Sequence, residues 1–174
     1  TYIAYLCYTQ NFYDSCINQE PMLIQHLKKE IKEGIREDVA TAFEDLKNSF
    51  EKQGYDVKMD NEGDFDVELT PGKIIVNIDK NLELSKTGET LKYGNFKISI
   101  LSRFYDIAIV AQEIASQEAR FCNFEQQGYM LFYPEFNIDK FRTGKSDTIY
   151  TIEHRKTKEK FRFAVRSCVI PPSF

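Results

Sequence analysis

Several signatures of known chemistry are missing from this chain of 174 residues. It has two histidines, His26 and His154, and neither lies at motif spacing from a nucleophile or a carboxylate. It contains no glycine-rich phosphate loop, no dinucleotide fingerprint and no His-Glu-x-x-His motif. The sequence therefore shows no recognisable catalytic motif, and we expect no catalytic residue, no metal site and no cofactor.

Glycine and proline are also scarce, with eight and five residues, which excludes collagen-like and low-complexity chains. Uninterrupted apolar runs such as residues 107–111 are far below the roughly 18 residues needed to cross a bilayer. With 42% hydrophobic, 14% aromatic and 29% charged residues, the composition is that of a globular chain with a genuine core. The formal net charge of -4 gives no overall attraction to nucleic acid or anionic lipid.

The four cysteines, Cys7, Cys16, Cys122 and Cys168, form no Cys-x-x-Cys pair, which argues against a zinc ribbon or a thioredoxin-type site. Cys7 and Cys16 bracket a short turn-forming stretch that a local disulfide would close. Cys122 ends a predicted helix and Cys168 follows the last predicted strand, so a second bridge would fix the C-terminal tail. Four cysteines allow three connectivities, and four reduced thiols in a cytosolic core are the alternative. Two bridges would indicate an oxidising, extracellular location.

We expect an aromatic N-terminal arm over residues 1–20 and a single α+β domain over residues 21–174. Between Pro21 and Gly54 the apolar residues recur every three or four positions, which predicts one long amphipathic helix. At 1.5 Å per residue such a helix would run to roughly 48 Å, longer than a small domain is wide. We therefore expect a bend near Gly34 or an exposed first half.

After this helix the hydrophobic period changes from helical to two. Residues 55–59 and 65–69 alternate apolar and polar side chains around a turn, which predicts a hairpin, and an antiparallel meander of four or five strands continues to residue 100. A second helix, apolar on most sides of its first half and therefore buried, is predicted over about 102–121. Strand signals return from residue 128 and predict a second antiparallel meander that ends near residue 165.

An acidic stretch of Asp60, Glu62, Asp64 and Asp66 surrounds the turn of the predicted hairpin. Carboxylates around a loop suggest calcium, but the glycine and the final bidentate Glu of an EF-hand are not at the required positions. We therefore interpret the stretch as a solvated hairpin turn, for which Asn-Glu-Gly-Asp is ordinary chemistry.

Residues 154–166 form a basic stretch, with six Lys and Arg against one Glu and a net charge of +5. Basic strands with interleaved aromatic residues can bind nucleic acid. Strand alternation places Phe161, Phe163 and Val165 on the face opposite Lys160 and Arg162, which favours a core role for the aromatic residues. The other interpretation is a charged edge hairpin protected against strand addition.

The N-terminal segment is apolar and aromatic without periodicity, too short to span a membrane and too hydrophobic for a solvated tail. Its candidate partner-binding residues are Tyr2, Ile3, Tyr5, Leu6 and Tyr8. One expectation is that the segment packs on its own core. The functional alternative is that it adds as a strand to the sheet edge of a neighbouring subunit.

Short motifs occur along most of the chain: Tyr5-Leu6-Cys7-Tyr8-Thr9, Ser15-Cys16, Gln19-Glu20-Pro21-Met22-Leu23, Phe50-Glu51 with Gly54-Tyr55, and Arg166-Ser167 before Pro171-Pro172. Together they resemble a group of uncharacterised archaeal surface proteins that are tethered by one N-terminal hydrophobic helix. The resemblance implies an anchor upstream of Thr1 and a location outside the cell, in agreement with the disulfides. It implies no activity for any residue.

The leading interpretation is a non-enzymatic, membrane-anchored or secreted domain at the cell surface that acts by protein–protein contact. It would work as a partner-binding or self-associating subunit of an envelope or filament assembly, without binding nucleic acid, and would reach a membrane only through an anchor that precedes Thr1. The alternative is an intracellular domain that binds nucleic acid through the basic hairpin over residues 154–166. Two bridges would favour the first, and binding that weakens steeply with salt would favour the second.

Overall fold

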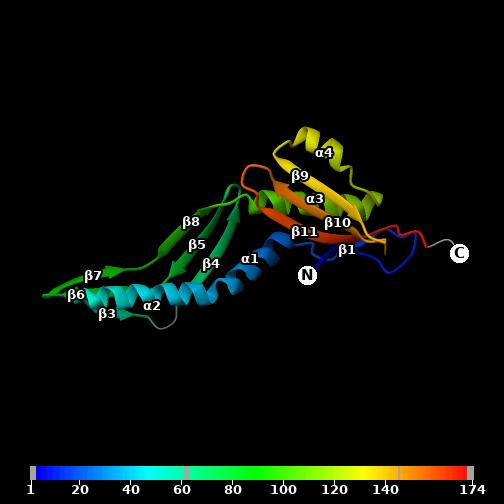
Figure 1. The fold of residues 1–174 in the computed structure, drawn as a ribbon. Coiled ribbons are helices and arrows are strands. Elements are labelled where there is room, and N and C mark those ends of the chain that lie inside the picture. Colours follow the sequence, from blue (N-terminus) through cyan, green and yellow to red (C-terminus); the bar gives the residue numbers. More distant parts are fainter. Residues whose placement is uncertain (1–2, 61–62, 145, 172–174) are drawn as a thin grey trace. The chain divides into compact units, whose positions relative to one another are not determined.

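A computed structural model describes residues 3–60, 63–144 and 146–171 of the chain. Over these residues the protein is α+β, which is the fold class that the sequence predicts, and it contains four helices and eleven strands (Figure 1). The chain divides into two compact units. We call Thr1–His26, Pro71–Lys73 and Leu101–Phe174 the terminal unit, and Leu27–Thr70 and Ile74–Ile100 the central unit. This division differs from the expected one, because the N-terminal arm belongs to the same unit as the second meander.

The terminal unit is built on a five-stranded sheet of order β2-β1-β11-β10-β9. Its strands are β1 (Tyr5–Tyr8), β2 (Ile17–Asn18), β9 (Phe136–Arg142), β10 (Thr148–His154) and β11 (Lys160–Arg166). The three C-terminal strands are antiparallel and form the predicted second meander. Strand β1 joins them by parallel pairing with β11, with Tyr5 opposite Ala164. This parallel pair was not expected from the sequence.

Helix α3 (Phe104–Phe121) packs on this sheet and contacts β1, β10 and β11. It buries an apolar stripe that includes Ile107, Ile114 and Ala115 against inward-facing residues of the strands. The predicted burial of this helix holds for that stripe, whereas Ile109 is 41% exposed. A short helix, α4 (Gln126–Phe132), lies along β9. The sequence analysis missed it and placed strand signals there, because its seven residues are too few to show a helical period.

The long helix predicted between Pro21 and Gly54 is two helices, α1 (Leu23–Gly34) and α2 (Arg36–Lys52). The interruption is local. The Ile35 N–H still donates to the Ile31 carbonyl at 3.0 Å, and the Val39 N–H donates to the Ile35 carbonyl at 2.9 Å. The break falls where a bend was expected, next to Gly34, the residue type with the lowest helix propensity apart from proline.

The central unit contains two three-stranded sheets, of order β3-β6-β7 and β4-β5-β8. Their strands are β3 (Asp56–Met59), β4 (Asp64–Thr70), β5 (Lys73–Asp79), β6 (Leu82–Lys86), β7 (Glu89–Tyr93) and β8 (Phe96–Leu101). The expected hairpin of 55–59 with 65–69 is wrong, because β3 pairs antiparallel with β6. Strand β4 lies beside β5 instead, across the tight turn at Gly72, whose φ of 78° suits glycine.

The core of the central unit lies between α2 and these sheets. Phe43 of α2 packs with inward-facing residues of β4 and β5, namely Phe65, Val67, Val76 and Ile78. A second cluster joins Val57, Leu82 and Leu84 of the other sheet. Leu46 of α2 packs against both clusters, so one helix covers the inner face of both sheets.

Candidate functional site

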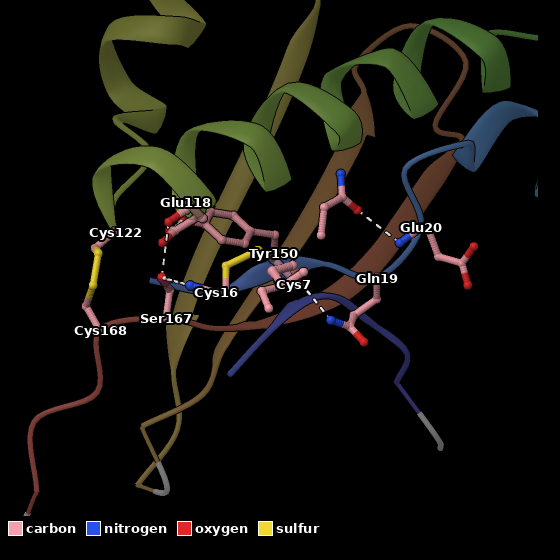
Figure 2. The surroundings of a disulfide bond; sticks show 11 residues. Cys7, Cys16, Gln19, Glu20, Glu118, Cys122, Tyr150, Ser167 and Cys168 are labelled. Atoms are coloured by element: carbon pink, nitrogen blue, oxygen red, sulfur yellow. Dashed lines mark hydrogen bonds between the residues drawn. A yellow bond between two sulfur atoms is a disulfide. The ribbon is translucent and has the colours of Figure 1, made fainter. Parts of the chain in front are cut away.

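Both predicted disulfide bridges are present, and none of the four cysteines, all within the described residues, is free. Cys7–Cys16 is buried and fixes the N-terminal arm beside the sheet (Figure 2). Cys122–Cys168 is half-buried and ties the C-terminal tail to the end of α3. The disulfide assignment made from the cysteine positions is therefore confirmed.

A buried polar network lies between the two bridges. Glu118 of α3 is only 3% exposed, and its carboxylate accepts a hydrogen bond from the Tyr150 hydroxyl. The Lys140 ammonium lies 3.7 Å from the same carboxylate and donates to Asn123 Oδ1 at 2.6 Å and to the Phe124 carbonyl at 3.1 Å. No buried side-chain nitrogen or oxygen of the described residues lacks a hydrogen-bond partner. The network is fully satisfied, which is the condition for a structural role in a core.

Burial perturbs the titration of this network. It raises the pKa of Tyr150, and the hydrogen bond to Glu118 raises it further. Burial also lowers the pKa of Lys140, while the nearby Glu118 carboxylate opposes that effect. The first cause of both shifts is the removal of a charged form from water.

Ser167 connects this network to both disulfides. Its hydroxyl accepts the Cys16 N–H at 3.1 Å and donates to the Glu118 carbonyl at 3.1 Å, as Figure 2 shows. Cys168 is the next residue along the chain, and Cys122 is one helical turn beyond Glu118, its N–H donating to the Glu118 carbonyl at 3.0 Å. The segments around Cys16 and Cys168 are therefore held together by the two bridges and by hydrogen bonds.

The structure places the candidate partner-binding arm inside its own sheet. Strand β1 has β2 on one side and β11 on the other, so neither of its edges is open to another chain. Leu6 is buried, and Ile3, Tyr5 and Tyr8 are half-buried. Tyr2 lies outside the described residues. The arm therefore packs on the core of its own chain, which was the first of the two expectations.

Most basic side chains of the hairpin over residues 154–166 bind carboxylates or carbonyls of this chain. Glu153 pairs with Lys158 at 3.0 Å and with Lys160 at 2.7 Å, and these two lysines hold the pKa of the Glu153 carboxyl below its ordinary value. Arg155 Nε donates to the Phe136 carbonyl, and Arg166 Nε donates to the Thr9 carbonyl. Phe163 and Val165 are buried and Phe161 is half-buried, so these side chains are not a platform for stacking bases.

Two carboxylates of the acidic stretch bind polar groups of other segments. Asp60 Oδ2 accepts hydrogen bonds from the backbone and side chain of Asn81, and Asp64 pairs with Lys32 at 3.0 Å. Glu62 lies outside the described residues. Over the part of the chain that the structure describes, no three His, Cys, Asp or Glu side chains are grouped so that they could hold a metal ion.

An open apolar strand edge is the feature that the sequence analysis did not single out. Strand β8 is an outer strand of the β4-β5-β8 sheet (Figure 1). Phe96, Ile98 and Ile100 alternate along it and share one face, and Phe96 packs into both core clusters. Ile98 is nevertheless 48% exposed and Ile100 is 52% exposed. The strand therefore carries a core-like pattern that this chain only partly covers.

A groove runs beside β8, between the strand and α2. It has a volume of about 460 Å³ and is lined mainly by apolar side chains, with Asp38 and Lys97 as its charged members. Its apolar residues include Val39, Ala42 and Leu46 from α2 with Phe96 and Ile98 from β8. The groove and the open edge of β8 form one continuous surface, which we call the β8 surface.

Comparison of the chain with protein-family models, with curated proteins and with solved structures gives no match. None of the helices in the described ranges is long and apolar enough to span a membrane.

Proposed function

We propose that this protein is a non-enzymatic extracellular or cell-surface domain that acts by protein–protein contact. We propose further that the contact joins copies of the chain through the β8 surface, as one interface of an envelope or filament assembly. The two disulfides support the location, because such bridges form and persist in oxidising compartments. The exposed apolar face of β8 is the observation that carries the contact.

An outer strand presents a row of unpaired backbone N–H and C=O groups to any strand that approaches it. Natural proteins usually blunt such edges with charged residues, prolines or bulges. Strand β8 has six residues with no proline and one charge, Lys97. Its edge would supply backbone hydrogen bonds to an added strand, and the groove beside it would receive apolar side chains.

The register of β8 favours a second copy as the occupant. In an antiparallel pair of two β8 strands related by a two-fold axis, Ile98 lies opposite Ile98 of the second copy. Phe96 then lies opposite Ile100, and Lys97 lies opposite Ser99. Apolar residues meet on one face, and no like charges meet on the other. The strand is thus complementary to itself.

The contact is tested by sedimentation velocity over a concentration series. In I98K two lysines face each other across the proposed axis. Because like charges repel, we expect the dissociation constant of the dimer to rise at least about ten-fold. The matched control is L91K, which places the same charge on an equally exposed residue of another outer strand, β7. Circular dichroism verifies that both variants fold.

Mixing variants tests the register itself. A mixture of I98K with I98D should form a heterodimer that neither variant forms alone, because Lys and Asp then face each other across the axis. A wild type that stays monomeric at about 1 mM contradicts the proposal. So does dissociation by L91K in place of I98K, or failure of the mixed variants to associate.

A further inference from the structure

The terminal unit contains a cleft that no part of the proposed contact uses. It has a volume of about 450 Å³ and lies among α3, α4 and the adjoining ends of β9 and β10. Small-molecule sites typically have volumes of roughly 300 to 1,000 Å³. The side chains that matter for its chemistry are Arg103, Asp106, Tyr129, Tyr133, Glu135 and His154.

One wall of the cleft is aromatic. The rings of Tyr129 and Tyr133 lie 4.6 Å apart, centroid to centroid, and are tilted by 31°. The ring of Tyr129 also packs against the ring of Phe124, with 5.3 Å between the centroids. Burial raises the pKa of Tyr129 to about 12. Tyr133 is 47% exposed. The wall therefore combines a fixed inner ring with an accessible outer ring.

Hydrogen-bonding groups of both kinds surround this wall. Asp106 and Glu135 supply carboxylate acceptors, and the Arg103 guanidinium, 3.3 Å from Asp106, supplies donors. His154 is nearly buried, and its Nδ1 accepts the backbone N–H of Thr157 at 3.2 Å. In the neutral ring the proton must then be on Nε2, which leaves that nitrogen as a donor.

We propose that this cleft binds one ring of a neutral saccharide. A sugar ring has apolar C–H faces, which stack on aromatic side chains, and hydroxyl groups at its rim that both donate and accept hydrogen bonds. The outer tyrosine offers the stacking surface, the two carboxylates accept from hydroxyls, and Arg103 and His154 donate to them. An organic cation fits less well, because Arg103 already compensates Asp106 and because two tyrosine rings inclined at 31° to each other do not enclose a charge.

The proposal is tested by saturation-transfer NMR on the intact, disulfide-bonded chain. The probes are methyl glycosides of glucose, galactose, mannose and N-acetylglucosamine. We expect at least one of them to receive magnetisation from the protein. Y133A should weaken its binding at least about ten-fold, and Y133F, which keeps the ring, should retain it. D106N should weaken binding by removing a charged acceptor.

F141A is the matched control, because Phe141 is an exposed aromatic residue of β9 that does not line the cleft. It should bind the probe like the wild type. The proposal is overturned if no glycoside binds at about 10 mM, if Y133A binds as well as the wild type, or if tetramethylammonium binds in a Tyr133-dependent manner instead. Because the readout is sugar binding, it is independent of the sedimentation test of the β8 surface.

Discussion

The bridge between Cys122 and Cys168 should be the larger source of chain-entropy stabilisation in the terminal unit. It joins residues 46 positions apart, whereas Cys7–Cys16 joins residues 9 apart. In the chain-entropy model these loops correspond to about 4 kcal/mol and about 3 kcal/mol of the free energy of unfolding at 25 °C. We therefore expect the double variant C122A/C168A to lose about 4 kcal/mol of stability.

Urea denaturation followed by near-ultraviolet circular dichroism measures this loss, and C7A/C16A provides the comparison. For a chain of this size a loss of about 4 kcal/mol corresponds to a fall in Tm of roughly 8 to 16 °C. A loss below about 1 kcal/mol in C122A/C168A refutes the reasoning, because the tail would then be held without the bridge.

The order of reduction gives an independent check on the same reasoning. Cys122–Cys168 is half-buried, so a thiol reductant should reach it in the native state. Cys7–Cys16 is buried beside β1, so it should be reduced only when the sheet opens. Alkylation and mass spectrometry should therefore find an intermediate modified at Cys122 and Cys168 alone. An intermediate modified first at Cys7 and Cys16 contradicts this order.

Three further predictions concern buried and paired charges. E118A should cost about 3 to 5 kcal/mol in urea denaturation, because it leaves Lys140 and the Tyr150 hydroxyl without their carboxylate, and E118Q should cost less. The folded-state pKa values of Tyr129 and Tyr150 are raised above the ordinary value of 10, so their stability contributions should be intact below pH 10 and decrease above it. The contribution of Tyr129, whose pKa is about 12, should be lost as pH rises through that value. Thermal melts against pH, with tyrosinate absorbance, measure that loss, and a midpoint unchanged between these pH values contradicts it. The Glu153 pKa is lowered, so its contribution is present above pH 4.5 and lost in acid; E153Q should flatten the acid limb of the melting curve.

The elements that the sequence predicted well are those whose pattern is local. Strand β10 alternates buried and half-buried residues along its whole length, β9 does so in its first half, and polar turns separate the three C-terminal strands. The buried helix α3 was predicted from residues that lie next to one another. The division of the first long helix at Ile35 was also marked locally, by Gly34.

Pairings between distant segments were not predictable in the same way. Strand β1 joins β11 across more than 150 residues, and nothing in the alternation of either strand specifies a parallel partner. Likewise β3 pairs with β6 and not with the next strand along the chain. The same limit applies to the network around Glu118, because Tyr150 lies 32 residues away from it. The sequence pattern predicts neither the burial of Glu118 nor its contact with Tyr150.

The β8 surface shows why a strand pattern does not by itself identify an interface. The alternation of Phe96, Ile98 and Ile100 correctly predicted a strand with one apolar face. Whether that face is core or surface depends on how far α2 extends over it, and the helix packs on Phe96 but leaves the two isoleucines half exposed. The exposure therefore follows from the placement of a helix that begins 60 residues earlier in the chain.

A comparison of the sheet edges explains why the contact is assigned to β8. In the terminal unit β2 is only two residues long, and the β9 edge is occupied by α4, with the Ile138 N–H donating to Met130 Sδ at 3.1 Å. In the central unit β4 carries acidic residues on the face opposite its apolar residues, so pairing it with a second β4 would bring carboxylates together. The two other outer strands of this unit carry more charge than β8, which has Lys97 alone: β3 has Asp56 and Lys58 among its four residues, and β7 has Glu89 and Lys92 among its five. Among the described strands, β8 thus combines an open edge, an apolar face and a register without like-charge repulsion, which is the combination that self-association requires.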